Sequence, residues 1–357
     1  MNILIAPDSF KGTLSAAEVS QITAEAIQAQ HPHHAIKTLP LADGGEGSID
    51  VLAESKTLEK RSLTVKDPLF RPVDSYYYYD AVEKTAYIEM AKASGITLVK
   101  HHELAATETT TFGTGELIRD ALKKGAGRII LFIGGSATND AGIGMAEALG
   151  MIFRNRNSQK LLPIGRNLKY ICEIDDYPMM PEAKPAEFIV ATDVNNPFYG
   201  PSGAAYVYGP QKGAGEPELR RLDEGLRHIS SIVKKQYGIN LQDLAGSGAA
   251  GGLGGGCAAF LNARIESGAD VIFKQLDFEP QVQWANLIIS GEGKIDTQSL
   301  YDKLLAKVAA VARRYETPLW AVCGYLEGRE QDLQPLGLQQ IFALAREKTD
   351  IEEAINH

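Results

Sequence analysis

Short apolar runs and helical repeats alternate over the first fifty residues. The runs NILIAP (2–7) and AIKTLPL (35–41) have the length of buried strands. Between them, residues 15–30 carry apolar side chains at helical spacing behind Ser15, which is a favourable N-cap. A strand, a helix and a second strand in this order predict a parallel sheet with right-handed crossovers.

Between residues 57 and 90 the pattern changes to three β-rich runs without a helical repeat between them. These runs are TLEKRSLTVKD, RPVDSYYYYDA and KTAYIEMA. They are typical of an antiparallel sheet and indicate that the chain has entered a second domain. Helix–strand alternation returns at TGELIRDALKKG and GRIILFIGG, and again at ANLIISGEG, PLWAVCGY and LQQIFALA near the end.

The length of 357 residues exceeds what one ordinary core accommodates. We therefore predict an α/β protein of two α/β domains, both discontinuous. The first, with a parallel sheet, comprises residues 1–56, 96–150 and 282–357. The second, a mixed α/β domain built from middle segments, comprises residues 57–95 and 151–281. The chain finishes DIEEAINH soon after the last strand, where a doubly wound domain usually has a full helix, so we expect a short tail to be missing.

Composition and charge exclude some classes of partner. The formal net charge is −9 and no block of lysine or arginine stands out, which argues against a general nucleic-acid or anionic-membrane partner. No apolar stretch approaches the roughly 20 residues that span a bilayer. The first residues, MNILIAPDS, read as a strand without a basic n-region or a cleavage site, so we expect no signal peptide. We expect a cytoplasmic protein. No surface stripe indicates an oligomeric state.

Four polar, glycine-rich segments follow apolar runs, and each precedes a helical pattern. Because the strand-to-helix loops of a parallel sheet lie at its carboxyl edge, we expect these segments to converge on one crevice. Their candidate ligand-binding residues are Asp8, Ser9 and Lys11; Asp43 and Glu46; Gly134, Gly135, Ser136, Thr138, Asn139 and Asp140; and Glu292 and Asp296.

These residue types favour a phosphate site. Backbone N–H groups exposed by glycine at helix N-termini attract phosphate oxygens, and Lys11 would add a positive charge. So many carboxylates beside phosphate are reconciled by Mg²⁺, which binds one or two carboxylates together with substrate phosphates. Phosphoryl transfer needs mainly positioning and charge stabilisation. The alternative is that these residues only cap helices and form turns.

A fifth segment, residues 191–214, places Asp193 at a strand end, followed by Asn196 and then Lys212. Asp193 could accept a hydroxyl proton, and Lys212 could pair with a carboxylate or phosphate. The alternative is an Asp that caps an Asn-Pro turn and a surface lysine. The run GGLGGG (251–256) follows no strand, so we reject a dinucleotide site there; close packing and a binding role both remain open.

Six motifs together carry a family resemblance over nearly the whole chain: APDSFKGTLSA, LADGGEGS, GGSATNDAGIGMAEALG, TDVNNPFYGPSGAAYVYGPQKGA, GSGAAGGLGGG and SGEGKIDTQSL. In this order they resemble the type I glycerate kinase family. The resemblance implies ATP-dependent phosphorylation of glycerate with Mg²⁺, in bacteria usually to 2-phosphoglycerate on the route that returns glyoxylate-derived carbon. It also implies two α/β domains, one Rossmann- or flavodoxin-like, with an active-site cleft between them. One departure is Asp302 before Lys303, where the family usually has glycine, so Lys303 is left out of the site.

The roles of individual residues are a hypothesis drawn from their chemistry. Lys11 and Lys212 would hold the carboxylate of glycerate, and Asp193 would orient and deprotonate the attacking hydroxyl. The ATP phosphates would lie on the Gly134–Asp140 loop, and one or two of Asp8, Asp43 and Glu292 would bind Mg²⁺.

Other functions stay open at this point. The 3-hydroxyl could be phosphorylated instead of the 2-hydroxyl, and a non-catalytic sugar-acid-binding protein would also have two domains. An NAD-linked dehydrogenase would need a dinucleotide fingerprint after the first strand, which PDSFKGT lacks.

Overall fold

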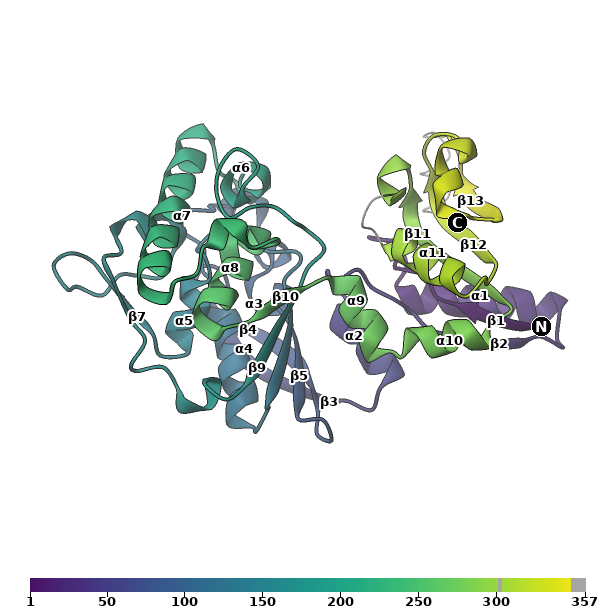
Figure 1. Ribbon diagram of the computed structural model, residues 1–357, viewed down its shortest axis with the longest axis horizontal. Coiled ribbons are helices and arrows are strands. Elements are labelled where there is room, and N and C mark those ends of the chain that lie inside the picture. Colours follow the sequence, from purple (N-terminus) through teal and green to yellow (C-terminus); the bar gives the residue numbers. More distant parts are fainter. Residues whose placement is uncertain (301–303, 348–357) are drawn as a thin grey trace. The chain divides into compact units, whose positions relative to one another are not determined.

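The computed structural model describes residues 1–300 and 304–347. The chain forms two compact units, each with its own sheet (Figure 1). Unit 1 consists of Met1–Asp43, Asp50–Lys56 and the residues from Gly268 onward, and unit 2 consists of Gly44–Ile49 and Thr57–Ser267. The tail after residue 347, and the predicted departure at Asp302 and Lys303, lie outside the described residues.

Unit 1 contains a five-stranded sheet in the order β13-β12-β11-β1-β2, in which every pair is parallel. Renumbered along the chain, this is the 2-1-3-4-5 order of flavodoxin-like folds, and it confirms the predicted parallel sheet. Ile3 and Ile5 of β1 pack with Leu287 and Ile289 of β11 in the centre of the sheet. The strands are β1 (Asn2–Ile5), β2 (Ala35–Thr38), β11 (Leu287–Ile295), β12 (Leu319–Leu326) and β13 (Gln340–Ala345).

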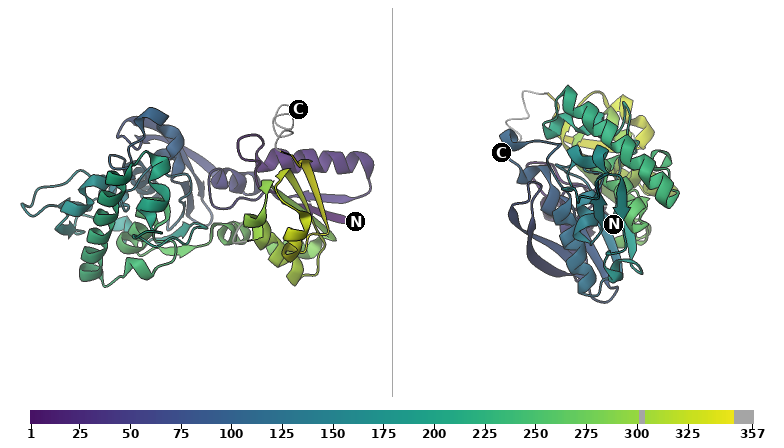
Figure 2. Two further views of the ribbon diagram at one scale, coloured as in Figure 1. Left: turned by 90° about the horizontal axis from the view of Figure 1, so that it is seen from above. Right: turned by 90° about the vertical axis from the view of Figure 1, so that its left-hand side faces the viewer.

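Helix α1 (Ala16–Gln30) begins at the predicted cap. The Ser15 hydroxyl accepts from the Glu18 N–H (3.2 Å), and the Glu18 carboxylate accepts from the Ser15 N–H (2.8 Å), which completes a capping box. The helix lies alongside the strands of the unit 1 sheet (Figure 2). The other helices whose residues lie in this unit, wholly or in part, are α2 (Ser48–Ser55), α9 (Gly268–Gln275), α10 (Phe278–Trp284), α11 (Leu304–Arg314), η7 (Thr297–Leu300) and η8 (Glu330–Leu336).

Unit 2 contains a six-stranded mixed sheet in the order β10-β9-β6-β5-β4-β3. Strands β3, β4 and β5 pair antiparallel, as the run of β-rich segments predicts, and the remaining pairs are parallel. The four tyrosines of β4 alternate, because Tyr77 and Tyr79 are buried whereas Tyr76 and Tyr78 are partly exposed. The strands are β3 (Glu59–Lys66), β4 (Pro72–Asp80), β5 (Thr85–Glu89), β6 (Arg128–Phe132), β9 (Glu187–Ala191) and β10 (Arg264–Glu266).

Helices and a small strand pair complete unit 2. Strands β7 (Ile152–Arg154) and β8 (Glu173–Asp175) form a separate antiparallel pair. The α-helices are α3 (Ala91–Ser94), α4 (Phe112–Lys123), α5 (Ile143–Ala148), α6 (Ala204–Tyr208), α7 (Glu216–Tyr237) and α8 (Ala249–Leu261). The short 3₁₀ helices are η1 (Ile96–Leu98), η2 (His101–Glu103), η3 (Gly165–Tyr170), η4 (Pro181–Ala183), η5 (Pro210–Lys212) and η6 (Leu241–Asp243).

The division differs from the predicted one in three segments. Residues 44–49, predicted in the first domain, belong to unit 2. Residues 96–150 belong to unit 2 instead of the first domain, because β6 pairs in parallel with β5 on one side and β9 on the other. Residues 268–281 belong to unit 1. The helix–strand rhythm of 112–132 therefore continues the mixed sheet and does not return the chain to the parallel one.

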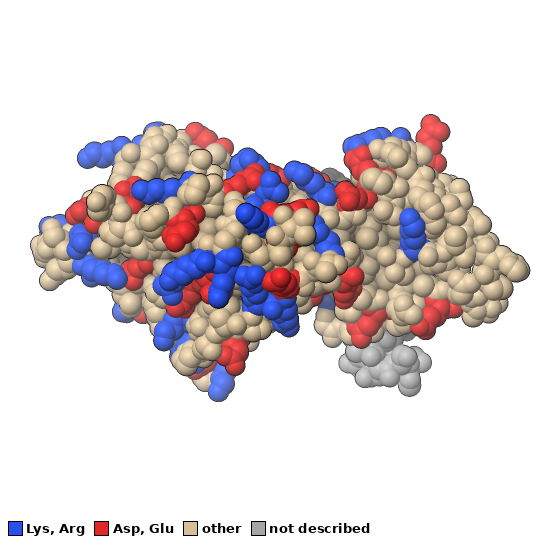
Figure 3. Space-filling view, turned by 90° about the horizontal axis from the view of Figure 1, so that it is seen from below, with Lys and Arg blue, Asp and Glu red and all other residues tan. Residues whose placement is uncertain are grey.

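The surface carries both signs of charge. On the face drawn in Figure 3, Lys and Arg side chains are interspersed with Asp and Glu side chains. No helix within the described ranges, 1–300 and 304–347, is both long and apolar enough to cross a bilayer.

Candidate active site

The first cluster of candidate residues lies at the point in unit 1 where the strand order reverses. In open α/β sheets of this kind, ligands bind beyond the carboxyl ends of the strands at such a switch point, here between β1 and β11. Asp8 follows β1, and its N–H donates to the carbonyl of Gly291 in β11 (2.8 Å). The Nζ of Lys11 lies 2.9 Å from Oδ2 of Asp43, which follows β2. Sequence segments far apart in the chain therefore meet at this edge.

The charged groups of this cluster change one another's pKa values. Burial raises the pKa of Asp8 to about 7, and the negative charges of Asp43 and Glu292 act in the same direction, while Lys11 and the Ser9 N–H oppose them. Burial alone would lower the pKa of Lys11, but Asp43, Asp8 and Glu292 together raise it above its ordinary value. Three carboxyl groups therefore share the field of one lysine, and an added cation would relieve their repulsion.

The neighbours of this cluster serve mainly to orient it. Asp8 Oδ1 accepts hydrogen bonds from the N–H (2.7 Å) and Oγ (3.4 Å) of Ser9. Oε1 of Glu292 accepts from Ser299 Oγ (2.5 Å). Asp296 forms an ion pair with Lys294 (3.2 Å), so it is partly compensated by its own strand.

The segment around Glu292 is not the loop that the sequence predicted. Strand β11 continues to Ile295, and Glu292 and Lys294 pair with Cys323 and Tyr325 of β12. The glycines of GEG therefore lie in an extended strand end, because β12 is long enough to pair with it. Glu292 still lies at the carboxyl edge, one residue after the Gly291 carbonyl that accepts from Asp8.

A divalent metal is compatible with this cluster, although the cluster is not a preassembled cage. Within the residues that the structure describes, no three or more His, Cys, Asp or Glu side chains are placed to hold a metal ion together. Mg²⁺ does not require such a cage, since it keeps several waters and takes one or two carboxylates plus substrate phosphates. Asp8, Asp43 and Glu292 supply oxygen ligands of that kind.

The second cluster lies in unit 2, in the loop after β6. Lys212, at the end of η5, is only 2% exposed. Its Nζ donates to Oγ of Ser136 (2.6 Å) and to the carbonyl of Thr138 (2.7 Å). Burial lowers the pKa of Lys212 to about 7, and the charge of Asp140 acts in the opposite direction. The lysine is therefore a core residue that fixes the loop, and not the surface lysine of the alternative interpretation.

Asp140 has a different role from the predicted contact with phosphate. Its side chain is fully buried and accepts four hydrogen bonds from the protein. The donors are the N–H (2.7 Å) and hydroxyl (2.8 Å) of Thr111 and the N–H groups of Gly142 (3.1 Å) and Gly144 (3.2 Å). Burial raises its pKa despite these donors. Asp140 joins the loop to the start of α4 and so holds it in shape.

The same loop carries polar atoms without partners. Oγ1 of Thr138 and both amide atoms of Asn139 are buried, and none has a hydrogen-bond partner in the described chain. A buried polar group left unpaired typically costs about 1–3 kcal/mol. Such atoms are expected where a ligand or an ordered water completes the structure.

The glycine-rich segment 246–256 packs against this loop. Gly251 has φ +67, and a Cβ atom added there would lie 2.1 Å from the Thr138 carbonyl oxygen and 2.5 Å from Cα of Asn139. Only glycine combines this backbone conformation with so close an approach. Of the two possibilities that the sequence left open for GGLGGG, the structure shows close packing.

The segment after β9 is held by local hydrogen bonds. Asp193 is partly exposed, and its Oδ1 accepts from Oγ of Ser267 (2.7 Å). The side-chain amide of Asn196 donates to the Ser202 carbonyl (2.9 Å) and accepts from the Tyr208 hydroxyl (2.6 Å). Asn196 therefore shapes its loop with both ends of its amide, whereas Asp193 keeps contact with solvent.

Glu89 was not among the residues predicted from the sequence. This residue ends β5, is completely buried, and accepts from the N–H of Gly47 (3.1 and 3.2 Å). The turn that contains Gly45 and Gly47 also contacts the β6 loop, because a Cβ on Gly134 would lie 2.7 Å from Cα of Gly45. Glu46 is exposed. A carboxylate at the end of an apolar run was the available signal, but no glycine follows Glu89 to mark it.

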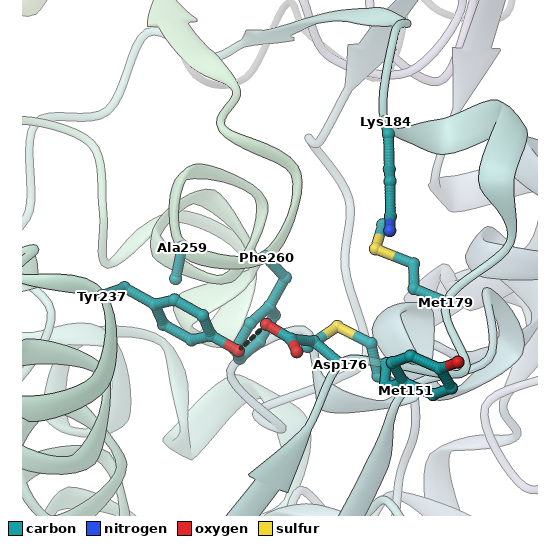
Figure 4. Close-up of a pocket in the computed structure, with 8 residues that line it drawn as sticks. Met151, Asp176, Met179, Lys184, Tyr237, Ala259 and Phe260 are labelled. Atoms are coloured by element: carbon teal, nitrogen blue, oxygen red, sulfur yellow. Dashed lines mark hydrogen bonds between the residues drawn. The ribbon is translucent and has the colours of Figure 1, made fainter.

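The four predicted segments therefore do not share one sheet. Those at Asp8, Asp43 and Glu292 belong to unit 1, and the Gly134–Asp140 loop belongs to unit 2, together with Asp193 and Lys212. The division follows from the pairing of β6 with β5 and β9. One cavity of about 230 Å³ in unit 2, lined mostly by apolar side chains such as Met151, Met179 and Phe260, contains none of the predicted residues (Figure 4).

The two clusters supply the kinds of group that phosphoryl transfer to a small molecule uses, namely carboxylates and a lysine at a switch point and a glycine-rich loop fixed by a buried lysine. The model of the glycerate kinase family matches residues 3–357. The chain belongs to this family, whose named members are phosphotransferases with an alcohol group as acceptor.

Several of its relatives carry the name glycerate kinase. The chain is 38% identical over 353 residues to a glycerate kinase of Halalkalibacterium halodurans, and 38% identical over 354 residues to a glycerate 2-kinase of Escherichia coli. Each alignment covers 99% of this chain and 93% of the relative. A crystal structure from Salmonella typhimurium LT2, described under the name glycerate kinase 2, superposes with a TM-score of 0.88 at 36% identity, covering 100% of this chain and 93% of that one.

Proposed function

We propose that this protein transfers the γ-phosphoryl group of ATP to D-glycerate and forms 2-phosphoglycerate. The observation that carries the proposal is the 38% identity, over 99% of the chain, to the E. coli protein named glycerate 2-kinase. The alternative product is 3-phosphoglycerate, since the two hydroxyls of glycerate differ only in their pose. Because the donor is ATP, we propose the cytoplasm as the compartment.

Unit 1 would supply the charge that the phosphates require. One or two of Asp8, Asp43 and Glu292 would hold Mg²⁺, which neutralises developing charge on phosphate oxygens when it is bound. The side chain of Lys11 is 70% exposed, so its Nζ can exchange Asp43 for a phosphate or the carboxylate of glycerate. The raised pKa of Asp8 supports a cation there, because a cation would favour the ionised carboxylate.

Unit 2 would supply the phosphate loop and the base. The loop from Gly134 to Asn139 offers backbone and side-chain donors to the polyphosphate, and its buried atoms without partners support a ligand there. Asp193 would orient the acceptor hydroxyl and take its proton, since it stands at a strand end and remains partly exposed.

The test is incubation with ATP, Mg²⁺ and D-glycerate, with ADP release followed continuously and the product identified by phosphorus NMR. A resonance that matches 2-phosphoglycerate supports the proposal, and one that matches 3-phosphoglycerate replaces the proposed product. Binding of D-glycerate in calorimetry without any ADP would show a sugar-acid-binding protein instead. L-glycerate serves as the matched control for stereochemistry.

A further inference from the structure

The contact between Lys212 and Ser136 fixes the direction of a hydrogen bond. When Lys212 is protonated, its ammonium group can only donate, so the Ser136 hydroxyl oxygen then accepts from it at 2.6 Å. The hydroxyl hydrogen of Ser136 is then left to donate elsewhere. Ser136 is 8% exposed while Lys212 is 2% exposed, so of this pair the serine is the more accessible. A ligand that reaches this pair therefore meets the Ser136 hydroxyl as a hydrogen-bond donor. The ligand group that suits this donor is an acceptor such as an oxyanion.

The charge of Lys212 is not neutralised by an ion pair. No carboxylate of the described residues lies within 4.0 Å of its Nζ, where its partners are a hydroxyl and a carbonyl. A second observation comes from the two residues that follow: Thr138 Oγ1 and both amide atoms of Asn139 are buried without partners in the described chain. The buried amine of Lys212 thus contacts a short loop that carries three unsatisfied polar atoms.

We propose that Ser136 is the entrance of an oxyanion subsite in unit 2, and that Lys212 is its positioning residue, which aims the Ser136 hydroxyl at the anion and takes up a proton when the anion binds. The ligand is defined by its chemistry, as a phosphate group or a carboxylate. This inference deepens the proposed function, because it assigns a binding mode to a loop that the proposed reaction uses.

Proton uptake follows from the position of the lysine. Burial lowers the pKa of Lys212 to about 7, so near pH 8 the free protein holds this group largely neutral. An anion beside Ser136 favours the charged form and raises that pKa again, so binding draws a proton from solution.

The other charged and titratable groups near Lys212 do not account for the expected proton uptake. Asp140 is the charged group whose field acts on it, and that carboxylate is engaged by four protein donors. On the segment that packs against the neighbouring Gly213, Glu103 and Glu108 are each paired with an arginine. Burial raises the pKa of Cys257, which is also in the field of Asp140, so it remains a thiol.

The experiment is isothermal titration calorimetry of the intact protein at pH 8 in two buffers of different ionisation enthalpy. The probes are ADP, inorganic phosphate and D-glycerate, each used alone. We expect uptake of a substantial fraction of one proton with at least one probe, and much less uptake at pH 6. Uptake with ADP and phosphate identifies a phosphate subsite, and uptake with D-glycerate alone identifies a carboxylate subsite.

Variants separate positioning from folding. K212M should abolish the uptake and weaken the responsive probe about tenfold or more, since charge-assisted hydrogen bonds are the strong ones. S136A, which removes one small hydroxyl, should weaken the same probe while the fold is kept. K184M, at an exposed lysine of the same unit, should bind like the wild type.

Two results overturn the proposal: no proton uptake with any probe, or S136A and K212M that bind and take up protons as the wild type does. Because these readouts need no turnover, they stand apart from the proposed reaction. If the protein takes up protons on binding as expected but releases no ADP in the activity assay, the subsite is supported and the proposed kinase activity is contradicted.

Discussion

The packing of Gly251 on the β6 loop gives a sharp test of how that loop is held. In G251A the new Cβ would lie 2.1 Å from the Thr138 carbonyl oxygen, and the residue would have to keep φ +67. The left-handed conformation costs an L-residue about 1–2 kcal/mol, and overpacking costs about 1–3 kcal/mol more. We therefore expect G251A to lower the free energy of unfolding by about 2–5 kcal/mol.

Gly238 provides a matched control in the same unit. It has φ +74 at the end of α7, but no atom lies within 4 Å of its virtual Cβ. G238A should therefore cost only the conformational part, about 1–2 kcal/mol. The difference between the two variants isolates the contact with Thr138 and Asn139.

The assay is urea unfolding followed by two probes. Circular dichroism reports on both units, whereas the two tryptophans, Trp284 and Trp320, both lie in unit 1. G251A should move the dichroism transition more than G238A does, with the tryptophan transition least affected. If the two variants lose the same stability within about 0.5 kcal/mol, the close approach of Gly251 to Thr138 adds no measurable cost, which contradicts the prediction.

Three further predictions concern chemistry and pH. D193N should lower kcat by about 100-fold or more while it melts like the wild type, and near-normal turnover would remove Asp193 from the mechanism. The free energy of unfolding of the wild type should increase from pH 7 to about pH 10, because in this range Lys212 keeps its proton in the unfolded state and has lost it in the folded state. Urea titrations at pH 7 and 9.5 should show this increase in the wild type and not in K212M. Chelation with EDTA should stop ADP release and Mg²⁺ should restore it, whereas activity that survives chelation would exclude a metal role for Asp8, Asp43 and Glu292.

The regular elements followed well from the sequence because their signals are local. Apolar runs predicted β1, β2, β6, β11, β12 and β13, and the β-rich runs of β3 to β5 indicated an antiparallel sheet without any knowledge of pairing. The assignment of 96–150 failed because β5 pairs antiparallel with β4 on one edge and parallel with β6 on the other. Which strand pairs with the second edge of β5 depends on residues far away in the sequence, and the hydrophobic pattern of β5 itself does not indicate it.

The candidate residues followed the same rule. Asp8 and Asp43 could be found because each follows an apolar run, and Lys11 and Asp43 do meet. The burial of Lys212 could not be predicted, since GPQKG has the composition of an exposed turn and its enclosure comes from loops more than 70 positions away. Glu89 was not predicted because its partner, Gly47, belongs to a turn that follows a different strand in the sequence.

The split make-up of unit 1 has a consequence for its biosynthesis. Strand β1 lies between β2 and β11 in the sheet, and β11 begins only at Leu287. Almost all of unit 2 is one continuous stretch, Thr57–Ser267, and only the short piece Gly44–Ile49 lies before it in the sequence. As the ribosome works towards the C-terminus, the two leading strands emerge with one flank open. They must wait there until the inserted unit has been made. A nascent chain stalled before Leu287 would therefore hold a complete inserted unit attached to an unfinished, aggregation-prone edge.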